Sequence, residues 1–301
     1  MQKLTSGILV VDKPEGITSA GVVALVKRRI HADKVGHCGT LDPFASGVLV
    51  CCINQATRIS RFFLHGDKSY EAVLRLGVET DTQDVTGKIV SASPVTVTED
   101  AIRSAFDTLV GPVRQQPPVY SALKHEGVPL YKLARSGRPM QKPARDIVIH
   151  RLSVLAVDLP DVHFGVTCSG GTYVRTLAAD LGRMLGCGAH LRKLVRTASG
   201  PFTLAQAAAL AEIASLDGPP AEMGRMIEMN EALAFIPKQT ADPRTAEKVR
   251  HGMPLTESDI RRPEPDGGSD WLRVVDPDDR LIAILAVKKE NSGYNYCCVF
   301  N

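Results

Sequence analysis

The residue best placed to do chemistry is Asp42, in the polar, glycine-rich loop GHCGTLDPFASG at 36–47. The loop stands between apolar segments, and Pro43 disfavours helical geometry at the preceding Asp. A carboxylate held in this way can act as a nucleophile or as a general acid or base, as Asp and Glu do in glycosidases. Asp42 could equally stabilise a turn, a common role of Asp in loops.

Other kinds of chemistry find less support. Cys38 has only His37 nearby as a partner base, and chain neighbours usually point apart, so we interpret Cys38 as a small structural residue. Cys187 and His190 are a lone pair of possible ligands, and the sequence has no CxxC, P-loop or dinucleotide motif. We therefore expect no metal and no cofactor.

Hydrophobic periodicity predicts the elements that hold the loop. Strands are expected over 7–11, 47–53, 70–76, 147–157 and 162–168. Helices are expected from Thr18 or Ser19 to 30 and over 56–64, 98–109, 130–135, 172–185 and 203–215, the 172–185 helix with Tyr173, Leu177, Leu181 and Met184 inward. Because strands and helices do not alternate regularly, we predict an α+β fold with a mixed, largely antiparallel sheet and flanking helices.

Length and composition predict two domains. A chain of 301 residues exceeds what one core usually holds. The character changes after Pro237, where strands are expected over 271–275, 281–287 and 294–300. We expect a large domain over 1–235, with a long basic insertion at about 112–145, and a small β-rich domain over 238–301.

The net charge of +3 conceals an uneven distribution. Residues 238–301 carry 10 Lys/Arg and 11 Asp/Glu, whereas the rest carries 26 and 22. Six basic residues and one acid fall between 124 and 145, and the clusters at 27–29 and 192–196 are also basic. Such patches suit a phosphate backbone, although a solvated basic face would explain the charge alone.

Compartment is indicated by cysteines and hydropathy. Seven cysteines, with adjacent pairs at 51–52 and 297–298, do not resemble a disulfide framework and fit a reducing cytoplasm. No signal peptide is visible, and the longest apolar run, 281–287, is too short to cross a membrane. We expect a cytoplasmic protein that does not contact membranes.

An ordered set of motifs adds a family resemblance. The segments are GILVVDKPEGITS at 7–19, the loop at 36–47, ATRISRFF at 56–63, KSYEAVLRLGVETDTQDVTG at 68–87, QQPPVYSALK at 115–124 and CSGGTYVRTLAADLG at 168–182. Their order and spacing resemble the TruB-type pseudouridine synthases, which modify the T-arm loop of tRNA. The stretch at 76–87 resembles the stand-alone bacterial enzymes rather than the RNA-guided relatives. The resemblance implies a cofactor-free isomerase that forms pseudouridine-55.

The resemblance also implies catalytic roles. Asp42 matches the family nucleophile and Arg175 the arginine that pairs with it, although an exposed helical Arg is commoner in general. Tyr70 matches the tyrosine that packs against the target base and takes part in removal of the C5 proton, although its alternation with core residues is ordinary strand packing. Tyr173 matches a binding position, yet its spacing from Leu177 also fits a core helix.

Further matches imply RNA binding. A target uridine must flip out of the RNA loop, and His37 matches the residue that enters the loop near it. Lys13 matches a family lysine beside the catalytic loop, for which a supporting role is expected. The insertion matches the part that grips the RNA arm through Lys124, Lys132, Arg135 and Arg138. The C-terminal domain resembles PUA-type RNA-binding domains through its position and strand pattern.

Two other classes of protein remain open at this stage. The first is a non-catalytic RNA-binding or tRNA-folding protein, which the set of Asp42, Tyr70 and Arg175 disfavours. The second is a hydrolase of small glycosides, which the basic insertion disfavours. The favoured interpretation is a monomeric enzyme acting on the T-arm stem-loop of tRNA. Whether its carboxylate attacks C1′, attacks C6 or assists a glycal route is left undecided by side-chain identity.

Overall fold

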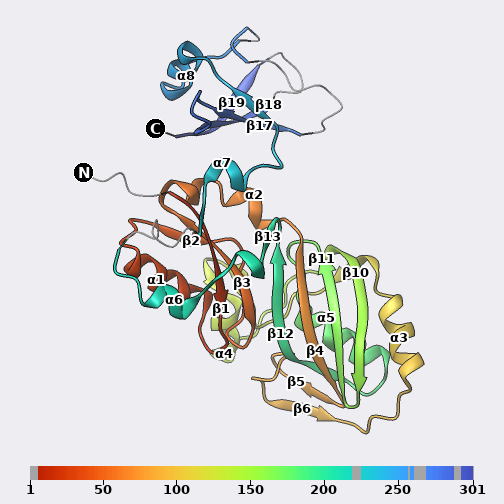
Figure 1. The fold of residues 1–301 in the computed structure, drawn as a ribbon. Coiled ribbons are helices and arrows are strands. Elements are labelled where there is room, and N and C mark those ends of the chain that lie inside the picture. Colours follow the sequence, from red (N-terminus) through yellow and green to blue (C-terminus); the bar gives the residue numbers. More distant parts are fainter. Residues whose placement is uncertain (1–5, 219–224, 257, 261–268, 288–292, 301) are drawn as a thin grey trace.

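A computed structural model describes residues 6–218, 225–256, 258–260, 269–287 and 293–300. It has the predicted α+β architecture, built on one large mixed sheet with a smaller β-rich module at the C-terminal end (Figure 1). The strands along the main path are, in order, β14 (Ala208–Ala209), β1 (Gly7–Lys13), β3 (Ser46–Ile53), β12 (Ala189–Ser199), β4 (Lys68–Leu76), β11 (Asp161–Cys168), β10 (Arg145–Asp158) and β7 (Gly111–Gln115). Three short strands join β3, β12 and β1 respectively: β2 (Val35–His37), β13 (Phe202–Thr203) and β15 (Met226–Ile227).

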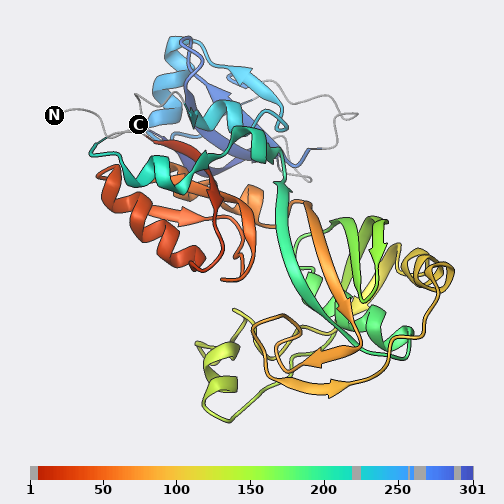
Figure 2. The same cartoon turned by 60° about the horizontal axis from the view of Figure 1, so that its bottom comes forward.

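The strand β12 joins the two halves of this sheet, as Figure 2 shows. It pairs antiparallel with β4 along most of its length, from Ala189 opposite Leu76 to Ser199 opposite Lys68. It pairs parallel with β3 only through Val195 and Arg196. The loop after β2 and the start of β4 both meet β12 at Arg196, which hydrogen-bonds to Gly39 O and pairs with Tyr70.

The helices of the described residues lie both on the large sheet and outside it. They are α1 (Ser19–Arg29), α2 (Arg61–Leu64), α3 (Glu99–Asp107), α4 (Leu130–Arg135), α5 (Val174–Met184), α6 (Leu210–Ala214), α7 (Met229–Ala232) and α8 (Pro243–Arg250), with 3₁₀ turns η1 (Asn54–Arg58) and η2 (Leu204–Gln206). Of the two predicted caps, Thr18 is the one used, because its hydroxyl accepts a hydrogen bond from Gly21 N. Helices α3 and α5 pack on the β4–β11–β10 half, where Phe106 meets Phe164 edge-on at 5.5 Å.

Several predicted elements were wrong in detail. The helix expected over 203–215 is instead β13, η2, β14 and α6, because Ala208 and Ala209 pair with β1 and this tertiary contact overrides alanine's helix propensity. The helix expected over 56–64 is divided between η1 and α2. Met184, expected to point inward, is 50% exposed. The start of the predicted insertion belongs to the large sheet as β7. Two short hairpins were not predicted. They are β5 (Val78–Thr80) with β6 (Ile89–Ala92), and β8 (Lys124–His125) with β9 (Val128–Pro129).

The C-terminal module contains the three predicted strands. A four-stranded sheet runs in the order β16 (Lys238–Thr240), β17 (Trp271–Val275), β18 (Leu281–Val287) and β19 (Tyr294–Val299), with α8 beside it. One face of this sheet, formed by β17, β18 and β19, packs on η1 and α2 of the larger part. Phe62 meets Trp271 edge-on at 5.1 Å, and Arg58 Nη1 donates to Val299 O at 2.6 Å.

Candidate active site

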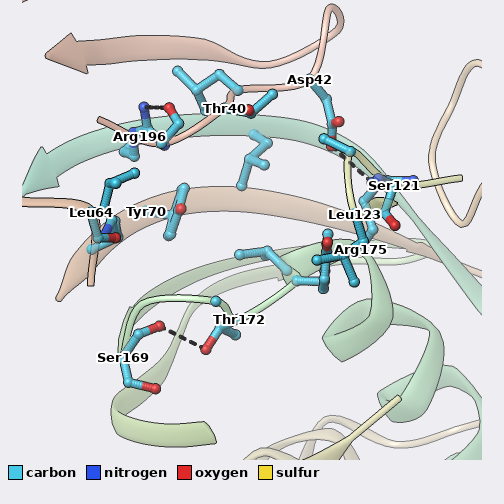
Figure 3. A pocket seen from close by; sticks show the side chains of 18 of the residues that line it. Thr40, Asp42, Leu64, Tyr70, Ser121, Leu123, Ser169, Thr172, Arg175 and Arg196 are labelled. Carbon is cyan, nitrogen blue, oxygen red and sulfur yellow. Dashed lines mark hydrogen bonds and ion pairs between the residues drawn. The ribbon is translucent and has the colours of Figure 1, made fainter. Parts of the chain in front are cut away.

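A cavity of about 370 Å³ opens where the two halves of the sheet meet. Its walls come from the 39–42 loop, the end of α2, β4, the segment 121–123, the start of α5 and β12. In Figure 3 Thr40 and Asp42 lie along the upper edge of the cavity, the side chain of Arg175 reaches Asp42, and Tyr70 lies on a separate strand. The topology therefore gathers into one site residues that are 133 positions apart in the chain.

Asp42 and Arg175 form an ion pair in this cavity. Arg175 Nε lies 2.9 Å from Asp42 Oδ2, and the two side chains are 4% and 34% exposed. Helix α5 begins at Val174, so its first turn carries Arg175 toward the loop. The sequence prediction that these two residues pair agrees with this geometry, and the commoner placement of a helical Arg in solvent does not apply.

The guanidinium of Arg175 is held rigidly from behind. Nη1 donates to Thr82 O at 2.7 Å, and Nη2 donates to Tyr120 O at 2.8 Å. Nη1 also lies 3.5 Å from Oδ2 of Asp84, a carboxylate that is 4% exposed. Asp84 in turn accepts hydrogen bonds from Thr82 and Thr86. Sequence reasoning did not single out Asp84, although it lies within the quoted motif at 68–87.

The environment of Asp42 shifts its ionisation. Burial raises the pKa of the Asp42 carboxyl, Arg175 and Lys13 oppose this shift, and the negative charge of Asp84 adds to it. A carboxylate that loses solvation but keeps one strong cationic partner is more basic and more nucleophilic than a free Asp. Asp42 can therefore donate electrons to an electrophilic carbon or hold a proton during a reaction.

The loop that carries Asp42 is fixed from below. Lys13 is fully buried, and its Nζ donates to Pro14 O and Ile17 O at 2.8 Å each, with Pro43 O at 3.4 Å. Ser19 Oγ accepts from Leu41 N at 2.8 Å and donates to Leu41 O at 2.9 Å. Lys13 was grouped with substrate-binding residues in the sequence prediction; its burial instead places it beneath the loop, in keeping with the supporting role also expected for it.

Arg196 is the main site residue that the sequence analysis misplaced. It was counted in an exposed basic cluster, yet it is 1% exposed and lines the cavity. Its Nε donates to Val48 O at 2.7 Å and its Nη2 to Gly39 O at 3.0 Å. Gly47 has φ +100°, and a Cβ there would lie 2.3 Å from Arg196 O, so only glycine fits. Strand alternation would have placed Arg196 on the same face as the exposed Arg192, because the register shift between Leu191 and Lys193 cannot be read from the sequence.

Tyr70 and Tyr173 both line the cavity, on different walls. Burial raises the pKa of the Tyr70 hydroxyl, which Arg196 partly opposes, so this phenol stays protonated. Tyr173 precedes α5 rather than lying within it, and its backbone is clamped by Gln115, which accepts from Tyr173 N at 2.8 Å and donates to Tyr173 O at 3.1 Å. The guanidinium of Arg145 lies 5.0 Å above the Tyr173 ring.

The remaining predicted binding residues lie outside the cavity lining. His37 ends β2, is half-buried, and its pKa is lowered by burial and by Arg196. The four basic residues of the insertion are exposed on β8, α4 and the turn after it: Lys124, Lys132, Arg135 and Arg138. Closer to the cavity the same insertion contributes Ser121, whose buried hydroxyl has no hydrogen-bond partner within the described part of the chain.

Within the described ranges, no three His, Cys, Asp or Glu side chains come together in a way that could hold a metal ion.

No helix in the described part of the chain is both long enough and apolar enough to cross a bilayer.

Comparison with known proteins gives a family match over most of the chain. Residues 27–174 match the N-terminal domain of the TruB family of pseudouridylate synthases, and residues 175–228 match the tRNA pseudouridylate synthase B C-terminal domain. The chain is 43% identical to tRNA pseudouridine synthase B of Burkholderia mallei, over 94% of this chain and 93% of the relative. It is 42% identical to the protein of the same name from Pseudomonas aeruginosa, over 94% of this chain and 92% of that relative.

Solved structures agree with the sequence relatives. One chain of a Cbf5–Nop10–Gar1 complex superposes with a TM-score of 0.73 at 28% identity, covering 98% of this chain and 85% of that one. A chain of an H/ACA RNP bound to a substrate RNA containing 2′-deoxyuridine superposes with a TM-score of 0.72 at 26% identity. The match covers 98% of this chain and 85% of that one. Fold and site thus define an isomerase of the pseudouridine synthase class. Within that class, the chain belongs to the TruB family.

Proposed function

We propose that this protein converts the uridine preceding C in the TΨC loop of tRNA into pseudouridine-55. The observation that carries the proposal is the Asp42–Arg175 ion pair, placed in a cavity whose other wall holds Tyr70. The reaction breaks the N1–C1′ bond, joins C1′ to C5 of the same base, and replaces the C5 proton by one on N1. Atoms are conserved, so the chemistry needs a carboxylate and positioning rather than an oxidant or a group donor.

Each site residue has a role in this proposal. Asp42 adds to C1′ or C6, or assists departure of the base through a glycal, and Arg175 keeps it ionised despite burial. Tyr70 packs against the flipped uracil, and its protonated phenol leaves it a positioning role at the C5 proton rather than the role of a base. Tyr173 and the free hydroxyl of Ser121 line the space around the base. Lys13 positions the loop from beneath.

RNA binding falls to the outer parts of the site. The uridine must leave its stack to reach Asp42, and His37, beside the catalytic loop, enters the vacated RNA loop. The exposed basic residues of the insertion contact phosphates of the T-arm. Residues 238–301 form a PUA-like domain that follows the catalytic part at 1–235. The enzyme works as a cytoplasmic monomer.

Tritium release tests the proposal directly. The purified protein is given tRNA labelled with tritium at uridine C5, and released tritium is counted for the wild type and for Asp42→Asn. The wild type should release label from one uridine per tRNA, and the variant none. Absence of release by the wild type would contradict the function, and release that survives in Asp42→Asn would contradict the role of Asp42.

A further inference from the structure

Two thiols touch beside the catalytic loop. Cys38 Sγ and Cys52 Sγ lie 3.3 Å apart, and neither residue is exposed. In the β2–β3 pair Gly36 is opposite Cys52, and Cys38 N donates to Val50 O at 2.9 Å. Cys38 is therefore the diagonal neighbour of Cys52 on the same face. Cys51 belongs to a different core cluster, on the opposite face of β3.

A hydrogen bond and two neighbouring cations act on the Cys38 thiol. The hydrogen bond from Cys52 and the charges of Lys68 and Arg196 lower the pKa of the Cys38 thiol against the opposing effect of burial. Lys68 is 6% exposed and its Nζ is held by the carbonyls of Leu64 and Gly66, at 2.6 and 2.5 Å, so its charge stays near the thiol. A thiolate is the form that peroxides oxidise.

The catalytic cavity leads to this pair. Gly39, the next residue after Cys38, lines the cavity without a side chain, and Lys68 lines it as well. A hydroperoxide small enough to enter the cavity therefore reaches Gly39, the residue next to Cys38. The same cavity would be filled by a flipped nucleotide, so bound RNA should protect the thiols.

We propose that Cys38 and Cys52 form a reversible disulfide that inactivates the catalytic loop. The Cys38 thiolate attacks hydrogen peroxide, breaking the O–O bond and, with one proton taken up, giving a sulfenic acid and water. The Cys52 thiol then attacks that sulfur, forming the S–S bond and releasing a second water. Two thiols are oxidised by two electrons and one peroxide is reduced. A dithiol reverses the step by thiol–disulfide exchange.

Disulfide formation must move the loop. Diagonal neighbours of an antiparallel pair have Cα atoms roughly 7–8 Å apart, whereas disulfides usually need 4.4–6.8 Å or so. Closing the bond draws the backbone at Cys38 toward β3. Gly39 O, which accepts from Arg196 Nη2 at 3.0 Å, moves with it, and Asp42 follows three residues later. A displacement of about 1 Å at a reacting group can cost about 10²-fold in rate.

Peptide mapping tests the cross-link independently of any activity. Cleavage by trypsin and before Asp42 separates peptide 35–41, with Cys38, from peptide 42–58, with Cys51 and Cys52. After hydrogen peroxide treatment the two peptides should be found joined, less so when RNA is bound. Cys51→Ala, the matched control from the same strand, should still cross-link, and Cys52→Ala should not. No cross-link in the wild type, or an equal one in Cys52→Ala, would overturn the proposal.

Activity tests the consequence. Peroxide should lower the kcat/KM of the wild type for pseudouridine formation by at least about tenfold, and dithiothreitol should restore it. Cys38→Thr, which keeps a side chain of similar size, should retain activity and resist peroxide, as should Cys52→Ala. If peroxide lowers the activity of the wild type and of both variants equally, and dithiothreitol restores it in all three, the inactivation belongs to other residues and the proposal is overturned.

Discussion

Arg175 meets Asp42 through Nε, at 2.9 Å, and leaves both of its Nη atoms bound to backbone carbonyls behind the site. Arg175 cannot follow Asp42 if the carboxylate moves, because both of its Nη atoms are held by backbone carbonyls. Asp84, the second carboxylate near this guanidinium, is satisfied by Thr82 and Thr86. Of the two acids, Asp42 is the one that lines the cavity, so one arginine contacts both a structural carboxylate and the proposed catalytic carboxylate.

Asp42→Asn should make the protein inactive and more stable at neutral pH. The folded-state pKa of Asp42 is raised above its ordinary value of 3.8, so its favourable contribution is present below 3.8 and is lost as pH rises through the folded pKa. At neutral pH the ionised, partly buried carboxylate destabilises the fold, and Asn removes that cost. Urea unfolding at pH 4 and pH 7.5 should show the stability advantage of the variant growing with pH. An advantage that shrinks with pH would contradict the raised pKa.

Arg175→Lys should lower kcat by about 10²-fold or more while the protein still folds. Lysine keeps the charge but cannot reach Asp42, Thr82 O and Tyr120 O together. Weaker pairing raises the pKa of Asp42 further, so the acid limb of the pH–kcat profile should move to higher pH. Arg183→Lys is the matched control, since Arg183 lies on the same helix with its side chain 60% exposed. An unshifted acid limb would argue against Arg175 as the partner that tunes Asp42.

Lys13→Met should reveal the cost of a buried ammonium. Burial lowers the pKa of Lys13 from 10.5 to about 8, although Asp42 and Glu15 oppose the shift. A lysine with a lowered folded pKa contributes stability that is present above 10.5 and is lost as pH falls through about 8. The stability of the wild type relative to the variant should therefore rise by about 3 kcal/mol between these pH values. Urea unfolding of both proteins at pH 7.5, 9 and 10.5 measures this difference in stability. A difference that does not change with pH would contradict the lowered pKa of Lys13.

The insertion should control the salt dependence of RNA binding. Replacing Lys124, Lys132, Arg135 and Arg138 by Ala removes exposed cations and should flatten the slope of log K against log salt by roughly 0.7–0.9 for each phosphate that is no longer neutralised. Filter binding of a T-arm stem-loop between about 50 and 300 mM salt measures the slope. The matched control is Arg103→Ala on α3, an exposed Arg outside the insertion, paired with Glu99. A change of slope equal to that of the control would assign the phosphate contacts elsewhere.

The sequence predicted the elements whose patterns are local. Alternation along 70–76 gave β4, a Thr18 or Ser19 cap and the helical pattern over 98–109 gave the starts of α1 and α3 to within a residue, and the three C-terminal strands were placed almost to the residue. β12 was not predicted, because Arg192, Lys193 and Arg196 interrupt its apolar alternation with charges. A buried arginine in a strand is recognisable only once Val48 O and Gly39 O are known to receive it.

The residues of the site differ in the same way in how far they could be predicted. Asp42 and Arg175 could be inferred as a pair because each lies in a recognisable motif, and the structure brings them within contact distance. The burial of Lys13 and the closeness of Cys38 to Cys52 depend on how β1, β2 and β3 stack, which no single segment encodes. Chemistry set by residue type was thus predictable, and chemistry set by tertiary packing was not.

The C-terminal module should be coupled to the cavity wall through Trp271. Its ring meets Phe62 edge-on at 5.1 Å, and the Arg61 guanidinium lies 5.0 Å from the same ring. At the other end of this helix, α2, Leu64 lines the cavity and its carbonyl holds Lys68 Nζ. Loosening the module should therefore disturb the wall as well as the interface.

Trp271→Ala should destabilise the protein by about 1–2 kcal/mol, from one aromatic pair and one cation–π contact. A double-mutant cycle with Arg61→Ala should give a coupling energy of about 0.5–1 kcal/mol, since the two side chains are in direct contact. Tyr296→Phe is the control inside the module, where the Tyr296 hydroxyl donates to Met253 O at 2.7 Å rather than to α2. Because α2 forms part of the wall, Trp271→Ala should raise KM for tRNA several-fold, whereas Tyr296→Phe should not. Additive energies in the cycle together with an unchanged KM would show that the module rests on α2 without influencing the site.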